Sequence, residues 1–142
     1  MKIVIASGYF NPLHTGHVSY LEEAKKLGDK LIVIVNNDKQ VNIKGSRKFM
    51  NEYDRATIVA GLKSVDAIWR SKSKDASVCK DLELLREAYP DDTLVFAKGG
   101  DRNINNIPEV QVCHENGIKM VFNVGDPKIT SSSDILELYN QP

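Results

Sequence analysis

Residues 8–17 read GYFNPLHTGH, between the apolar run KIVIAS at 2–7 and the stretch VSYLEEAKKLG at 18–28. The first flank has the β-branched, nearly continuous apolar character of a buried strand. In the second flank apolar residues recur at helical spacing, with Thr15 available as the N-cap and Gly28 where a helix commonly ends. The stretch therefore predicts a turn that leads from a strand into a helix.

Four more apolar runs follow along the chain, separated by helical patterns. They are LIVIV, VDAIW, TLVFA and KMVFNV, at 31–35, 65–69, 93–97 and 119–124. The remaining helices are expected within 51–64, 75–90, 107–117 and 131–140. Strands that are apolar on both faces are typical of parallel sheets covered by helices. With right-handed crossovers the pattern predicts an α/β fold, a Rossmann-like doubly wound five-stranded parallel sheet of order 3-2-1-4-5 in three layers, α/β/α.

The composition limits the class of protein. The 142 residues suit one domain spanning 1–142, and 42% hydrophobic with 27% charged residues is typical of a soluble globular chain. Lys and Arg number 19, as do Asp and Glu, so no overall charge favours nucleic acid or a membrane surface as a partner. The N-terminal sequence lacks the features of a signal peptide, and we expect a cytoplasmic protein. Cys79 and Cys113 are far apart in sequence and are expected to be reduced, packed side chains.

The predicted order of strands also predicts where a ligand binds. The direction of winding reverses between the first and fourth strands, and ligands in such sheets bind outside the carboxyl ends at that reversal. The loops that meet there are 7–17 and 98–103. Gly8 and Gly16 allow close approach of the backbone, and the start of the following helix attracts an anion.

His14 and His17 lie three residues apart at this turn, and the chain has three histidines in all. Residues at this spacing share one face of a helix, so both imidazoles can donate to the same anion. We favour a phosphate-binding role over the alternative that they only cap the helix. A zinc site is a further alternative, but the spacing differs from that of helical zinc ligands and no third ligand is placed nearby.

FNPLHTGH resembles the H-x-G-H motif of the nucleotidyltransferase superfamily, which includes cytidylyltransferases and adenylyltransferases. Four segments are similar, in order and spacing, to the adenylyltransferases that act on D-glycero-D-manno-heptose 1-phosphate. They are 16–38, 54–66, KGGD at 98–101 and ITSSSDIL at 129–136. The likeness therefore runs along almost the full length of the chain.

This resemblance implies transfer of AMP from ATP to a sugar phosphate or similar phosphorylated alcohol, with release of pyrophosphate. The acceptor phosphate is already ionised, so catalysis needs positioning and charge stabilisation rather than a general base. His14, His17 and Lys44 are the implied catalytic residues, with Lys44 placed in the loop after the second strand. Mg²⁺ is the implied cofactor, bound mainly through the phosphates of the nucleotide rather than by protein ligands. We also expect a homodimer.

The resemblance implies two further sets of residues. Those expected to bind the nucleotide are Gly8, Tyr9, Phe10, Gly16, Lys98, Gly99, Gly100, Asp101, Thr130, Ser131 and Ser132. Those expected to bind the acceptor are Asn11, where many relatives have aspartate, and Arg55, a cation that the dipole disfavours in the first turns of a helix.

Two alternatives remain open at this point. One is a cytidylyltransferase that uses CTP on glycerol 3-phosphate or a related alcohol, although the chain reads GDPK at 125–128 where cytidylyltransferases carry Arg-Thr-x-Gly. The other is a module that binds a nucleotide without turning it over.

Overall fold

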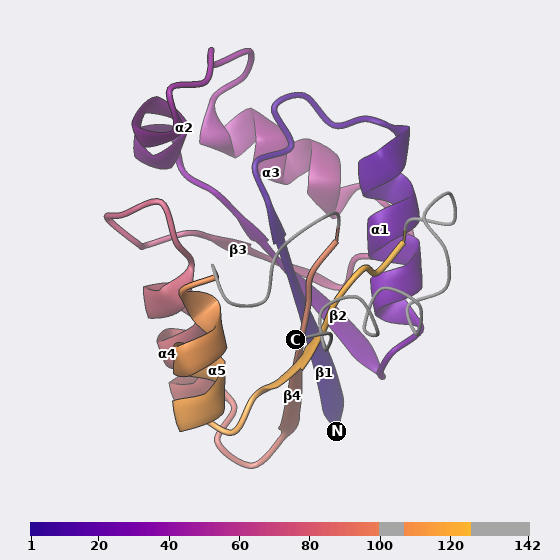
Figure 1. Ribbon diagram of the computed structural model, residues 1–142. Coiled ribbons are helices and arrows are strands. Elements are labelled where there is room, and N and C mark those ends of the chain that lie inside the picture. The colour runs from indigo at the N-terminus through magenta and orange to yellow at the C-terminus, as the bar shows by residue number, and fades with distance from the viewer. Residues whose placement is uncertain (100–106, 126–142) are drawn as a thin grey trace, which may run out of the picture.

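The computed structural model describes residues 1–99 and 107–125 (Figure 1). Its strands are β1 (Lys2–Gly8), β2 (Lys30–Val35), β3 (Ala67–Arg70), β4 (Thr93–Ala97) and β5 (Lys119–Val121). All neighbours pair in parallel, in the order β3-β2-β1-β4-β5, which confirms the predicted Rossmann-like sheet. The strand β5 is shorter than the predicted range 119–124, because Asn123 has a φ angle of 60°, which extended backbone does not adopt.

Helices cover both faces of this sheet. They are α1 (Thr15–Lys25), α2 (Asp38–Lys44), α3 (Glu52–Ala60), α4 (Cys79–Ala88) and α5 (Glu109–Glu115). Figure 1 shows α4 and α5 together on one side of the strands and α1 and α3 on the other, which confirms the three layers. In the described ranges no helix is long and apolar enough to cross a membrane. The helix expected within 131–140 lies outside the described residues.

The core consists of two apolar clusters, one on each face of the sheet. Val4 and Val33 pack with Leu21 of α1 and Val59 of α3 in the first cluster. The second cluster contains Ile3, Ile5, Ile32 and Ile34 together with Leu82 and Leu85 of α4. Successive side chains of a strand point to opposite faces. The strands are therefore apolar without interruption because each face needs its own core.

The helix α2 is an element that the sequence did not predict. Its N-cap Asn37 accepts a hydrogen bond from the backbone N–H of Gln40 at 2.8 Å, and the Gln40 side chain accepts one from the N–H of Asn37 at 2.9 Å. Gly45 ends the helix with a φ of 78°. Lys44 is thus the last residue of a helix rather than part of a loop. The stretch was missed because Val41 is the one apolar side chain that it buries, so no helical apolar stripe is visible.

Tyr20 of α1 occupies the point where the winding reverses. Pairing between β1 and β4 ends at Ile5 and Phe96. Beyond that pair the Tyr20 hydroxyl accepts from the N–H of Ser7 at 3.2 Å and donates to the carbonyl of Ala97 at 2.5 Å. The hydroxyl satisfies backbone groups that the diverging strands no longer pair. It also holds α1 against the carboxyl edge of the sheet, where its N-terminus lies (Figure 1).

Candidate active site

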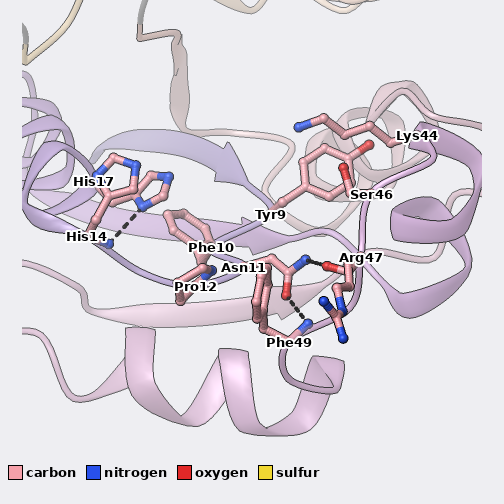
Figure 2. A pocket seen from close by; sticks show the side chains of 10 residues that line it. All are labelled: Tyr9, Phe10, Asn11, Pro12, His14, His17, Lys44, Ser46, Arg47 and Phe49. Atoms are coloured by element: carbon pink, nitrogen blue, oxygen red, sulfur yellow. Dashed lines mark hydrogen bonds between the residues drawn. The ribbon is translucent and has the colours of Figure 1, made fainter.

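A cavity of about 440 Å³ lies at the N-terminus of α1 and beside the C-terminal end of α2. Its lining residues are Tyr9, Phe10, Asn11, Pro12, His14, His17, Lys44, Ser46, Arg47 and Phe49 (Figure 2). The structure therefore brings together the three residues expected to be catalytic with three of the expected ligand contacts. The segment 46–49 was not assigned to the site from sequence. Its signal was the cluster of cations KGSRK at 44–48.

The two histidines cap α1 reciprocally. His14 is the N-cap, and its Nδ1 accepts from the backbone N–H of Gly16 at 3.1 Å. The Nδ1 of His17 accepts from the backbone N–H of His14 at 3.1 Å. The arrangement is a capping box in which two imidazoles replace the usual hydroxyl and carboxylate. Thr15, which the sequence suggested as the N-cap, is the first residue of the helix instead.

This cap fixes the tautomer of both rings. An Nδ1 that accepts a hydrogen bond carries no proton, so the ring proton is on Nε2. The ring centroids of His14 and His17 are 3.8 Å apart with an interplanar angle of 31°, so the rings stack at a tilt (Figure 2). Capping and ligand binding are therefore compatible, because they use opposite nitrogens of each ring.

His17 is uncharged at neutral pH. Burial, reinforced by the nearby His14 and Lys44, lowers the pKa of His17 from 6.5 to about 4. His17 is thus a neutral hydrogen-bond donor. The side chains of Lys44 and Arg47 bring full positive charge to the cavity.

Phe10 packs against the His17 ring, and Gly8 and Gly16 leave the space that the rings of Phe10 and His14 occupy. The Phe10 ring is 1% exposed and meets the His17 ring edge-on at a centroid distance of 5.0 Å. A Cβ at Gly8 would lie 2.7 Å from the Phe10 ring, and one at Gly16 would lie 2.9 Å from Cε1 of His14. The aromatic and imidazole rings of the site therefore require glycine at both positions.

Lys44 rests on an aromatic ring at the rim of the cavity. Its Nζ lies 4.3 Å from the centroid of the Tyr9 ring. A cation–π contact at an exposed position contributes about 0.5–1 kcal/mol. A charge-assisted hydrogen bond to a phosphate is stronger, so Lys44 can leave Tyr9 for an anionic ligand at small cost.

Arg55 is buried beneath the cavity and does not line it. Its side chain is 0% exposed and donates to the carbonyls of Tyr9 at 2.7 Å and Asn36 at 2.6 Å. It also donates to the Met50 carbonyl and pairs with the Asp38 carboxylate at 2.8 Å. The predicted acceptor contact is therefore corrected: Arg55 positions the loop after β1 relative to the start of α2. The surrounding carbonyls and Asp38 compensate the unfavourable helix dipole.

Asn11 holds the neighbouring loop of the cavity. Its Nδ2 donates to the carbonyl of Arg47 at 2.7 Å, and its Oδ1 accepts from the N–H of Phe49 at 2.9 Å (Figure 2). The amide thus bonds the backbone of 47–49 on both sides. The predicted acceptor contact of Asn11 is in this structure a contact to the loop that forms one wall of the cavity.

The remaining predicted nucleotide contacts lie at the end of β4 or beyond the described ranges. Lys98 is 7% exposed, and a Cβ at Gly99 would lie 3.0 Å from the Tyr20 ring. Neither lines the cavity. Gly100, Asp101, Thr130, Ser131 and Ser132 lie outside the described residues.

The possible metal ligands are also spread out. Within 1–99 and 107–125, no three His, Cys, Asp or Glu side chains are placed to hold a metal ion. Cys79 and Cys113 are free thiols, and burial raises the pKa of Cys113 to about 12, so that this thiol stays protonated.

Comparison with known proteins identifies the family. The profile of the cytidylyltransferase-like family matches residues 5–137. The chain belongs to the cytidylyltransferase-like family. This match confirms the resemblance that the histidine motif indicated. The members of the family are nucleotidyltransferases.

Individual relatives differ in how much of each protein is matched. The FAD synthase of Picrophilus torridus is 34% identical over 148 residues, which covers 99% of this chain and 100% of that protein. The bifunctional protein HldE of Haemophilus ducreyi is 42% identical over 118 residues, but the match covers 82% of this chain and 23% of HldE. A lipopolysaccharide core biosynthesis protein from Thermoplasma volcanium has a similar solved structure, with a TM-score of 0.71 and 27% identity over 89% of this chain and 98% of that chain.

The lowered pKa of His17 predicts a specific pH dependence of stability. The unfolded chain takes up a proton on His17 near pH 6.5, whereas the folded chain takes it up near pH 4. The unfolded state therefore binds more protons between these values, and the free energy of unfolding falls as the pH drops through this window. Urea unfolding of the wild type and of His17→Ala at pH 7 and pH 5 tests this.

The fall in the free energy of unfolding is expected to be smaller in His17→Ala than in the wild type. The exposed His114 offers a matched control, and His114→Ala is expected to retain the wild-type fall. Equal falls in the wild type and in His17→Ala would contradict the buried, neutral imidazole.

Proposed function

We propose that this chain transfers the adenylyl group of ATP to a phosphate monoester and releases pyrophosphate. The observation that carries the proposal is the reciprocal cap, which leaves the Nε2–H donors of His14 and His17 together in a cavity that Lys44 also lines. Membership of the cytidylyltransferase-like family supports the reaction class. The choice of adenylyl over cytidylyl transfer is our own.

The reaction requires no proton to be removed from the nucleophile. An ionised oxygen of the acceptor phosphate attacks the α-phosphorus of ATP, a new P–O bond forms, and the bond to the bridging oxygen of the leaving pyrophosphate breaks. His14 and His17 would donate from Nε2 to oxygens that gain charge in this step, and Lys44 would supply a full positive charge beside them. Preorganised donors of this kind contribute chiefly through electrostatic stabilisation and orientation.

Magnesium is proposed to enter with the nucleotide. Mg²⁺ commonly keeps several waters and binds through substrate phosphates with one or two carboxylates. The described part of the cavity offers amide, hydroxyl and cationic side chains rather than a carboxylate cluster, which fits an ion held by ATP. When bound, the ion would neutralise part of the phosphate charge.

FMN is the acceptor that we favour. FAD consists of FMN joined to AMP, so an FAD synthase would use FMN as its phosphate monoester. The FAD synthase relative aligns with this chain from end to end, whereas the chain spans about a fifth of the HldE proteins that it matches. The heptose phosphate that the sequence motifs suggested is thus the second candidate. A homodimer and a cytoplasmic location remain predictions.

An acceptor and nucleotide panel tests the proposed reaction. ATP and CTP are each combined with FMN, D-glycero-D-manno-heptose 1-phosphate or glycerol 3-phosphate in the presence of MgCl₂, and pyrophosphate release is measured. We expect ATP with FMN to give a kcat/KM at least tenfold above every other pair, about 1.4 kcal/mol in the transition state, with FAD as product. A preference for heptose phosphate would overturn the acceptor alone, and a preference for CTP would overturn the adenylyl assignment. If none of the nucleotide–acceptor pairs released pyrophosphate, the result would contradict an enzymatic role.

Replacement of His17 tests the histidine chemistry. His17→Ala removes one preorganised donor, and we expect turnover to fall about 10²- to 10⁴-fold. His114→Ala, which changes the exposed histidine of α5, is expected to keep wild-type turnover. Circular dichroism of both variants shows whether they are folded. Wild-type turnover in folded His17→Ala would contradict the catalytic role.

A further inference from the structure

Phe49 is an exposed aromatic side chain beside the proposed reaction centre. Its side chain is 65% exposed, yet it lines the same cavity as His14 and Lys44. The other large apolar residues with exposed side chains in the described ranges are Met1, Ile43, Tyr53 and Ile58. None of these lines the cavity. Phe49 therefore differs from a scattered surface residue, because a ligand in the cavity can cover it.

Two hydrogen bonds to Asn11 hold the loop that carries Phe49. Asn11 donates to the carbonyl of Arg47 and accepts from the N–H of Phe49, and Asn11 belongs to the same loop as His14. The loop that carries the phenyl ring is thus joined to the loop that carries the imidazoles. An aspartate at position 11 could accept from Phe49 but could not donate to Arg47. The amide, rather than a carboxylate, is what this arrangement requires.

The charges around Phe49 limit what could cover it. Arg47 lines the cavity, as does Lys44. Lys48 precedes Phe49 in the chain, and its Nζ lies 4.0 Å from the Asp38 carboxylate. A purely apolar ligand would gain nothing from these cations. An acceptor that joins an anionic phosphate to a planar ring through a flexible chain could place its phosphate near the histidines and its ring on Phe49.

We propose that Phe49 determines acceptor specificity by stacking against the planar heteroaromatic ring of the acceptor, and that Asn11 is the residue that positions it. This inference rests on the proposed function, because it concerns the second substrate of the same site. Stacked aromatic pairs gain more than their buried area alone provides. A sugar phosphate has no aromatic plane and gains less from the same ring. The loop 46–49 thus favours a flavin phosphate over a heptose phosphate.

Substitutions at position 49 separate the aromatic plane from apolar bulk. In Phe49→Ala and Phe49→Leu we expect the KM for FMN to rise at least tenfold, with the KM for ATP within twofold of the wild type. Phe49→Trp keeps a stacking plane and is expected to retain an FMN KM within threefold of the wild type. The control Ile58→Ala removes an exposed apolar side chain outside the cavity and is expected to change neither constant.

A double-mutant cycle tests the positioning role of Asn11. Asn11→Asp is expected to raise the KM for FMN when Phe49 is present and to have less than a twofold further effect in the Phe49→Ala background. Independent, multiplicative effects of the two substitutions would overturn the positioning role.

Direct binding distinguishes failure of this inference from failure of the proposed function. Quenching of FMN fluorescence by the wild type and by Phe49→Ala reports stacking without turnover, and we expect the quenching to be lost in the variant. If the wild type converts FMN to FAD but Phe49→Ala keeps the same KM and quenching, the inference is wrong and the proposed function stands. If the wild type neither binds nor converts FMN, the flavin acceptor and this inference both fail. Adenylyl transfer to heptose phosphate would then be the surviving form of the proposed function.

Discussion

The hydrogen bonds that the rings of His14 and His17 accept at the start of α1 are the constraint on which the site depends. Each Nδ1 accepts a backbone N–H of the first turn, so the protons of both rings are on Nε2. The same bonds satisfy backbone donors that a helix start leaves unpaired. Gly16 is required because the His14 ring lies against it, and the buried Phe10 ring supports His17. The hydrogen bonds that begin α1 therefore also determine which nitrogen of each ring is left to donate.

Contacts of Arg55 connect the histidine loop to α2, the helix that ends at the cation Lys44. Arg55 has no exposed surface and bonds the carbonyls of Tyr9 and Asn36 while it pairs with Asp38. It thus connects the loop that carries the histidines to the helix that ends at Lys44. Loss of Asp38 would leave the buried guanidinium of Arg55 without its counter-charge, so this connection is part of the fold as well as of the site. Tyr20 holds α1 against the sheet, because its hydroxyl bridges the backbone of Ser7 and Ala97.

The fold was largely predictable from sequence because the strands contribute apolar side chains to the clusters on both faces of the sheet. Ile3 and Ile5 serve one face and Val4 the other, which makes the strands visible as continuous apolar runs. The helix α2 was not predictable in this way, because it buries Val41 and is held by the Asn37 and Gln40 cap instead. The cap residues were present in the sequence, but without an apolar stripe they did not single out a helix.

The cavity was predictable in its histidines and less so in their neighbours. Residue type and spacing placed His14 and His17 at one site, and the resemblance to nucleotidyltransferases added Lys44. The structure brings the three together. The resemblance assigned Arg55 and Asn11 to the acceptor, and the sequence does not reveal which carbonyls lie within reach of each side chain. Both bond backbone of the cavity walls instead. Phe49 was missed because its place in the cavity wall depends on a contact with Asn11 across 38 positions of the chain.

The central claim is that two imidazoles with protons on Nε2 bind the nucleotide phosphates. Long-range ¹H–¹⁵N correlation spectra of the histidine side chains at pH 7, without and with a non-hydrolysable ATP analogue and MgCl₂, test it most directly. The account predicts the Nε2–H tautomer for His14 and His17, a neutral His17, and shifts of both Nε2 resonances on addition of the analogue while those of His114 stay in place. A proton on Nδ1 of either ring, or Nε2 resonances that do not respond to bound nucleotide, would contradict it.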